Sequence, residues 1–364
     1  MTDALHLGFV YDDEALTAEA PTINRLGVGL LAEGHRVMRV VSPAGSATID
    51  RLSLATRIEM PMSTPPWLRR ARAADALAAM KSAIPDLFIV RGNGAWTAAA
   101  DLALAAERPL LADVWRPADV GRVARLVRRG RFAGAIAPAA SIAAALQREL
   151  GAARVRAVPL GVGVPATARP VLARPDDAIT IAVVGSGDDL AAWRSVLSGL
   201  SMLCREMPQI ELFVELGGSI AHAIWREARR LDLLGQMTAI EEISEVRRLL
   251  TRCDMMVLPE PLSEARSIIL EAMAIGMPVV GVEDPLHPFL RDGETADVLA
   301  TPLPPEPEAW SAVLGRRLSD AAEARALGLH GRHEIEVSHR SSHRIERLAD
   351  AAAHLIGRDT PAPS

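Results

Sequence analysis

Short apolar segments alternate with helical segments along almost the whole sequence, and this alternation restricts the possible folds more than any other feature. The first series of apolar segments comprises residues 7–11, 37–41, 87–90, 110–112 and 135–137. Apolar runs of this length are typical of strands buried on both faces of a parallel sheet. The stretches between them have helical periodicity. Residues 22–33, for example, carry apolar side chains on one face, and Gly34 ends that helix.

The alternation is interrupted at residues 164–177, where three prolines stand in a stretch without a clear period, as in an interdomain linker. A second series of apolar segments follows at residues 179–184, 210–216, 255–258, 279–282 and 298–299. Strands that alternate with helices in this way form right-handed βαβ units and parallel sheets. The sequence therefore predicts an α/β protein with two Rossmann-like domains, residues 1–165 and 166–335. A helical segment with a frayed end is expected at 336–364.

The composition excludes several classes of function. A chain of 364 residues can form two domains that each bury a core. The net charge of −5 gives no indication of nucleic-acid binding, which requires positive charge to neutralise phosphates. Cys204 and Cys253 lack CxxC spacing, so we expect no disulfide framework and no metal site. The sequence starts without a basic leader and has no apolar run of membrane-spanning length, so we expect a cytoplasmic protein.

The segment from residue 253 to residue 293 is the most informative about function. A strand ends near residue 259, and a polar loop with Ser263 and Glu264 leads into a helix that begins at about 265–267. A helix N-terminus offers free backbone N–H groups and a positive dipole, which suit a diphosphate. Glu271 lies one turn further along, where a carboxylate can accept hydrogen bonds from ribose hydroxyls. The alternative is an ordinary solvated glutamate, but its apolar neighbours favour a position facing a cleft.

The residues from Glu271 onward also resemble a known family. The run EAMAIGMPVV, residues 271–280, is similar to the donor-binding segment of retaining GT-B glycosyltransferases of the family-4 type. In that family a strand ends in Pro-Ser, and Glu-x7-Glu-Ala-Met-Ala-x-Gly-x-Pro-Val-Val follows. Residues 30–37, 158–162, 254–259 and 291–295 resemble other parts of the family more weakly.

The resemblance implies the GT-B fold, in which two facing Rossmann-like domains enclose a ligand cleft. The last helix, here 343–357, is then expected to cross back to the N-terminal domain. The resemblance further implies a retaining, metal-independent glycosyltransferase. Such an enzyme takes a nucleoside-diphosphate sugar as its donor substrate and needs no separate cofactor.

The sequence departs from the family pattern at positions that usually serve the reaction. Eight positions before Glu271 the family has a glutamate, whereas this chain has Ser263, with Glu264 displaced by one. The family's Phe-Gly is replaced by Ala265-Arg266. The arginine and lysine that follow the first strand of the family's second domain are missing from residues 185–189. The resemblance thus implies a donor site that has lost several of its usual charged residues.

Arginine has to supply the positive charge, because Lys81 is the only lysine and lies in the first domain. A guanidinium can hold a diphosphate through two parallel donors. Arg266 is expected at the helix N-terminus, and Arg91 or Arg116 across the cleft. The predicted catalytic residues are Arg266, Glu264 and Arg91. The predicted donor-binding residues are Glu271, Ser267, Ala265, Ser263, Gly185 and Ser186, although Gly185-Ser186-Gly187 also fits an ordinary tight turn.

Three functions remain open at this point. The first is a divergent glycosyltransferase. The basic run at 122–131 is then either a solvated helix face or a surface that attracts an anionic or membrane-associated acceptor. The second is a catalytically inactive GT-B protein that binds or regulates a protein partner. The third is another Rossmann enzyme with a nucleotide cofactor, which is disfavoured because residues 11–14 read Tyr-Asp-Asp-Glu instead of the glycine-rich fingerprint.

Overall fold

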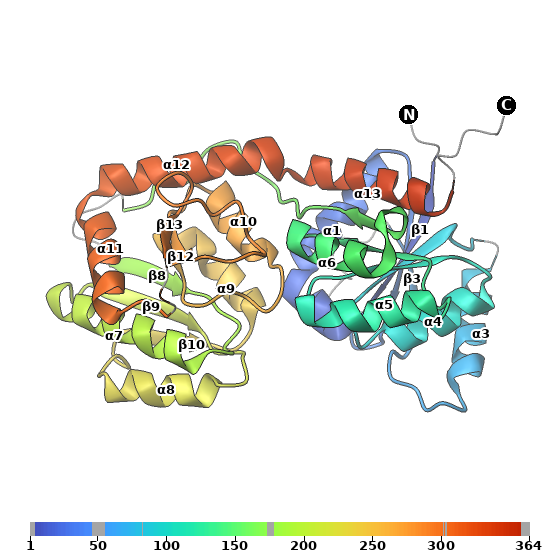
Figure 1. Ribbon diagram of the computed structural model, residues 1–364, viewed down its shortest axis with the longest axis horizontal. Coiled ribbons are helices and arrows are strands. Elements are labelled where there is room, and N and C mark those ends of the chain that lie inside the picture. The colour runs from blue at the N-terminus through green and yellow to red at the C-terminus, as the bar shows by residue number, and fades with distance from the viewer. Residues whose placement is uncertain are drawn as a thin grey trace. The chain divides into compact units, whose positions relative to one another are not determined.

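The computed structural model describes residues 4–45, 55–81, 83–172, 178–300, 302 and 304–357. The chain forms two compact units, Met1–Gly161 with Ser341–Ser364, and Val162–Arg340. We call them the N-terminal unit and the C-terminal unit, and Figure 1 shows each as a sheet with helices around it. The end of the predicted linker, residues 173–177, and the tail at 358–364 lie outside the described residues.

The N-terminal unit contains a parallel sheet with the strand order β3-β2-β1-β4-β5-β6-β7. Its strands are β1 (His6–Tyr11), β2 (Arg36–Val41), β3 (Thr56–Glu59), β4 (Leu87–Arg91), β5 (Leu110–Asp113), β6 (Gly134–Ala137) and β7 (Val155–Ala157). Its α-helices are α1 (Asp13–Ala32), α3 (Arg69–Met80), α4 (Trp96–Ala105), α5 (Val120–Arg128), α6 (Ala140–Leu150) and α13 (Ser341–Leu355). Short 3-10 turns occupy Pro117–Asp119 and Ala152–Arg154. In Figure 1 α13 lies beside α1, and its Ile345 and Leu348 belong to the core of this unit.

The C-terminal unit contains a second parallel sheet with the order β10-β9-β8-β11-β12-β13. Its strands are β8 (Ile179–Val183), β9 (Ile210–Glu215), β10 (Met237–Ile240), β11 (Met255–Leu258), β12 (Val279–Val282) and β13 (Asp297–Leu299). Its α-helices are α7 (Leu190–Glu206), α8 (Ala221–Arg230), α9 (Ile243–Leu249), α10 (Ser267–Ala274), α11 (Pro307–Ser319) and α12 (Ala321–Ser338), with a 3-10 turn at Leu250–Arg252. Trp193 of α7 and Trp310 of α11 are fully buried in its core.

The strand order reverses direction at one point in each sheet, between β1 and β4 and between β8 and β11. Ligands of doubly wound sheets bind at such points, beyond the carboxyl ends of the strands. In the C-terminal unit the reversal places the loop after β8 beside the loop after β11. These are the two loops that carry most of the donor-binding residues predicted from the sequence.

The predicted fold class is confirmed, since both units are doubly wound α/β structures with parallel sheets. The observed units divide between Gly161 and Val162 and between Arg340 and Ser341. Three strands at sheet edges, β3, β7 and β10, were not predicted. Among the described helices, none combines the length and the apolar character needed to cross a membrane.

The packing of α7 on α11 makes a testable prediction about stability. A Cβ atom at Gly199 of α7 would lie 2.6 Å from the Pro307 carbonyl oxygen and 2.7 Å from the Trp310 Cβ atom. Gly199→Ala should therefore lower the free energy of unfolding by about 1–3 kcal/mol through overpacking. The matched control is Gly315→Ala on α11, where the nearest atom is 3.4 Å away. That change should be neutral or stabilising by up to about 1 kcal/mol. Denaturant titrations that rank the two variants in the opposite order would contradict this packing.

Candidate functional site

The carboxylate of Glu260 organises the loop between β8 and α7. Its Oε1 atom accepts hydrogen bonds from Gly187 N at 2.6 Å and from the Trp193 indole N–H at 3.0 Å. Its Oε2 atom accepts from Asp189 N at 2.7 Å, and Asp188 N contributes weaker bonds. The residue is almost fully buried. The backbone N–H groups of this glycine-containing loop, which could otherwise cradle a phosphate, are thus bound to an internal carboxylate.

Arg266, the N-cap residue of α10, directs its guanidinium into the same loop region. Its Nη1 atom donates to both oxygens of Glu215, at 2.9 and 2.8 Å, and lies 3.4 Å from the Gly185 carbonyl oxygen. Glu264 lies 3.5 Å from its Nε atom. Burial raises the pKa of the Glu215 carboxyl, although the charge and hydrogen bond of Arg266 act in the opposite direction. Arg266, the cation predicted for the site, therefore lies at the start of α10 and is paired with Glu215.

The predicted binding residues after β8 and β11 lie in contact. Ser263 N donates to Ser186 Oγ at 2.8 Å, and the two hydroxyl oxygens lie 3.0 Å apart. Ala265 is buried and carries no functional atom beyond its backbone. Gly187 adopts a φ of +67°, and a Cβ atom there would lie 2.8 Å from Gly218 Cα. The loop after β8 therefore packs so closely on the loop after β9 that only glycine fits at this position.

Glu271 lies on α10 in a bonded group with Ser267 and Arg247. Arg247 of α9 donates from Nε to Glu271 Oε2 at 2.7 Å and from Nη2 to Ser267 Oγ at 2.9 Å. Ser267 Oγ donates to Glu271 Oε1 at 3.3 Å. The side chains of Arg247 and Glu271 are only 8% and 16% exposed, so the alternative of a solvated glutamate does not describe the structure. Sequence reasoning missed Arg247, because nothing in the motif specifies its partner on another helix.

A buried histidine–aspartate pair supports the start of α10 from the loop after β12. His287 Nδ1 lies 2.8 Å from Asp284 Oδ2, which also accepts from Leu262 N at 2.9 Å. Burial opposes ionisation of Asp284, but the hydrogen bonds from His287 and backbone N–H groups leave its pKa lowered overall. His287 Nε2 accepts from Arg266 N at 3.3 Å. The pair thus fixes the loop backbone on both sides of the predicted contact residues.

Arg91, the third predicted catalytic residue, lies in the N-terminal unit. It ends β4, is mostly buried, and places its guanidinium 3.2 Å from the centroid of the Trp115 ring. Arg116, named with it as an alternative cation, pairs with Glu14 of α1. The other predicted site residues gather in the C-terminal unit. Among the described residues, no group of three or more His, Cys, Asp or Glu side chains could hold a metal ion.

Two doubly wound units with polar loops at the strand-order reversal define the GT-B class of protein. Residues 191–320 match the family described as "Glycosyl transferases group 1". The resemblance inferred from the sequence is therefore confirmed: residues 191–320 are similar to group 1 glycosyltransferases, and the chain has the GT-B fold. The matched segment contains Arg266, at the start of α10, and Glu271 within that helix, but it ends before α12 and α13.

Solved structures support the same fold over nearly the whole chain. A glycosyltransferase from Rickettsia africae ESF-5 has a TM-score of 0.75 and 14% identity, with 98% of this chain and 100% of that chain covered. Anabaena HepE in complex with UDP and glucose has a TM-score of 0.74 and 13% identity, with 96% and 99% covered. Sucrose-phosphate synthase from Thermosynechococcus elongatus has a TM-score of 0.71 and 17% identity, with 98% and 100% covered. At such identities the likeness establishes the fold. No curated protein sequence matches the chain.

The ion pair between Arg266 and Glu215 makes a testable prediction. Arg266→Gln leaves a buried carboxylate without its partner, which should lower the free energy of unfolding by about 3–5 kcal/mol. The double variant Glu215→Gln/Arg266→Gln removes both charges and should lose less than the single variant. Arg291→Gln serves as a control, because its pairs with Glu294 and Glu334 are exposed and should contribute less than about 1 kcal/mol. If Arg266→Gln and Arg291→Gln lower the free energy of unfolding equally in thermal or urea unfolding, the buried ion pair stabilises the fold no more than the exposed pairs do.

Proposed function

We propose that this protein is a cytoplasmic, retaining and metal-independent glycosyltransferase that transfers a sugar from a nucleoside diphosphate to an acceptor. The observation that carries the proposal is the gathering of Ser186, Ser263, Arg266 and Glu271 beyond the ends of β8 and β11. These residues occupy the position where doubly wound units bind nucleotides. The segment that matches group 1 glycosyltransferases contains three of them. Anabaena HepE, which shares the fold, has been solved with UDP-glucose.

The chemistry of the transfer explains why a cation is needed. The bond between the anomeric carbon and the diphosphate oxygen breaks, and its electron pair remains on the diphosphate. The acceptor oxygen bonds to the anomeric carbon, and its proton passes to the departing diphosphate. Negative charge therefore grows on the diphosphate in the transition state, where preorganised donors lower the barrier most. We assign Arg266 and the first N–H groups of α10 to this role, with Arg91 as a candidate from the N-terminal unit.

Glu271 and Glu264 are assigned to binding of the donor. An ionised carboxylate offers about four acceptor positions on its two oxygens. Glu271 can therefore keep its bonds to Arg247 and Ser267 and still accept hydrogen bonds from ribose hydroxyls. Glu264 is the candidate for the first glutamate of the family motif, and its 3.5 Å distance from Arg266 brings it to the same loop.

A second function is favoured by one specific observation. Glu260 satisfies the N–H groups of residues 187–189, and Glu215 satisfies Arg266. Both interactions are the kind that a bound diphosphate would make. A catalytically inactive GT-B protein, which binds or regulates a protein partner, would retain its fold through these internal carboxylates and need no donor.

The first test of the proposal is nucleotide binding. Calorimetric titration with UDP, GDP and ADP should show binding of at least one nucleoside diphosphate. Glu271→Ala should weaken that binding by about 1–3 kcal/mol, because polar partners are left unpaired. Glu227→Ala is the matched control, since Glu227 is a buried glutamate that pairs with Arg230 on α8 of the same unit. Unchanged affinity in Glu271→Ala, with an unfolding temperature like that of the control, would make Glu271 a structural residue.

The second test separates an enzyme from an inactive protein. Hydrolysis of the donor, or transfer of its sugar, should fall on the order of 10²–10³-fold in Arg266→Ala, the scale for loss of one preorganised donor. Because this variant also strands Glu215, Glu215→Gln/Arg266→Ala is measured beside it as a control for folding. If the wild-type protein shows neither turnover nor nucleotide binding, the enzyme proposal fails and the inactive alternative stands.

A further inference from the structure

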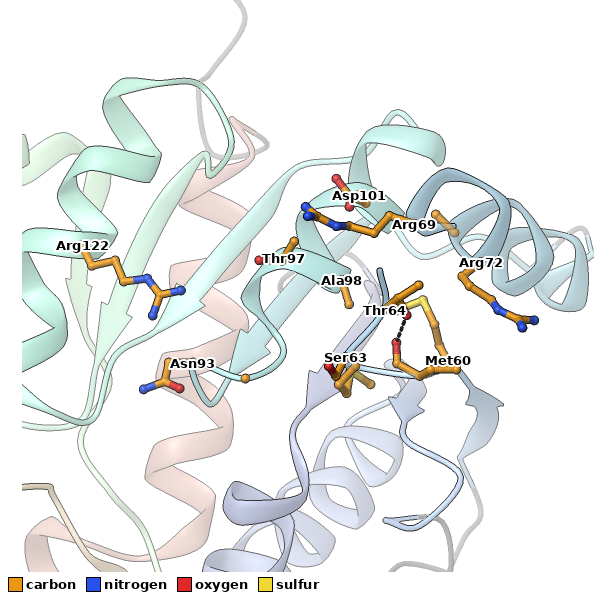
Figure 2. Close-up of a pocket in the computed structure, with 14 residues that line it drawn as sticks. Met60, Ser63, Thr64, Arg69, Arg72, Asn93, Thr97, Ala98, Asp101 and Arg122 are labelled. Carbon is orange, nitrogen blue, oxygen red and sulfur yellow. Dashed lines mark hydrogen bonds between the residues drawn. The ribbon is translucent and has the colours of Figure 1, made fainter. Parts of the chain in front are cut away.

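A pocket of about 370 Å³ opens in the N-terminal unit. Figure 2 shows it between the segment after β3, the first turn of α4 and the arginines of α3 and α5. The pocket lies beyond the carboxyl ends of β3 and β4, on the edge of the sheet where ligands bind. Its volume is within the range of small-molecule sites. It is therefore large enough for a sugar-sized group.

The walls of the pocket carry an excess of positive charge. Arg69, Arg72 and Arg122 line it, whereas Asp101 is the one acidic residue among its lining residues. Asp101 is already paired with Arg131, at 2.8 Å. The pocket thus has three cationic side chains and one carboxylate, and that carboxylate is paired with an arginine that does not line the pocket.

Two of the three arginines are placed to bind a ligand. In Figure 2, Arg69 extends from α3 toward Asp101 and Thr97, and Arg122 lies on the side of Asn93. Within the described part of the chain, neither forms an ion pair with a carboxylate within 4.0 Å, although the Asp119 carboxylate attracts Arg122 over a longer distance. Arg122 is steadied by the Trp96 ring, with 4.8 Å between guanidinium carbon and centroid. Arg72 points away in the same view and lies 3.5 Å from Asp75.

The backbone adds to the positive potential. The first turns of α3 and α4 both contribute to the lining, and their N-cap residues, Leu68 and Ala95, make no capping side-chain hydrogen bond. Uncapped N-termini present N–H groups and the positive end of the helix dipole. Ser63, Thr64, Asn93 and Thr97 supply uncharged polar groups around the arginines, which suit sugar hydroxyls.

We propose that this pocket binds the oxyanion of an anionic sugar acceptor, a carboxylate or a phosphate group, through Arg69 and Arg122. A guanidinium holds a carboxylate or a phosphate through the same two-pronged geometry. The assignment of the ligand as an acceptor rests on the proposed glycosyltransferase function. The assignment of the pocket as an oxyanion site rests only on its own residues.

The experiment measures binding of inorganic phosphate and of glucuronate to the full chain by calorimetry, with glucose as the uncharged probe. Arg69→Gln and Arg122→Gln should each weaken both oxyanions about tenfold, the loss of one hydrogen bond to a charged group. The weak binding of glucose should change less. Arg70→Gln and Arg125→Gln make the same charge change on the same two helices outside the pocket lining. These controls should bind both oxyanions like the wild type.

A third variant tests whether the net positive charge of the pocket lining favours oxyanion binding, without removing a lining arginine. Arg131→Gln releases the Asp101 carboxylate from its ion pair and so adds an unpaired negative charge to the wall of the pocket. It should weaken phosphate and glucuronate binding by about two- to fivefold at low salt, with a smaller effect at high salt. Unchanged binding would contradict the assigned role of Asp101 and Arg131.

The same preparations distinguish failure of this inference from failure of the proposed function. Absence of phosphate and glucuronate binding, or equal losses in pocket and control variants, overturns the oxyanion site. If Arg69→Gln weakens nucleoside-diphosphate binding and Glu271→Ala does not, the pocket is a nucleotide site and the acceptor assignment is wrong. Oxyanion binding that depends on Arg69 and Arg122, in a protein that binds no nucleoside diphosphate, supports the pocket and contradicts the proposed donor chemistry.

Discussion

The carboxylate of Glu260 ties together the two strands between which the C-terminal sheet reverses its order. Glu260 follows β11, and its side chain extends to the loop after β8. There it accepts hydrogen bonds from Gly187 N, Asp189 N and the indole N–H of Trp193. A buried carboxyl group is costly unless several donors surround it, and here the backbone and the Trp193 indole supply them. The position of Ser186 against Ser263, and of Gly185 beside Arg266, follows from this attachment. A donor diphosphate would have to bind next to this arrangement and not in place of it.

The sequence predicted those parts of the fold in which both faces of a strand are buried. The central strands, such as β1, β4, β8 and β11, are continuous apolar runs and stand out without knowledge of their neighbours. The edge strand β3, with the sequence TRIE, and the edge strand β10, with MTAI, each expose half of their residues or more. Such strands form because their backbone pairs with the neighbouring strand. Their own local sequence does not indicate this pairing.

The candidate site shows the same difference between residues that the local sequence marks and residues that depend on distant parts of the chain. Arg266, Ser263 and Glu271 could be predicted as site residues because they lie within one continuous motif, whose spacing is set by a single loop and helix. Glu215 and Arg247 were missed, although each makes the closest ion pair to a predicted residue. They come from β9 and α9, 51 and 24 residues away from their partners. Their role depends on how strands and helices pack, and neither residue carries a local pattern that marks it.

The placement of α13 has a consequence for the order in which the protein is made. Ile345, Leu348 and Ala352 of this last helix fill the same core as Leu26 and Leu30 of α1. The N-terminal unit is therefore discontinuous along the chain, and the ribosome releases its final helix only after the whole C-terminal unit has been synthesised. Domains commonly fold as they emerge, beginning with the first. In this protein the first unit to emerge is the last to be completed, and until then it exposes the apolar side chains that α13 covers.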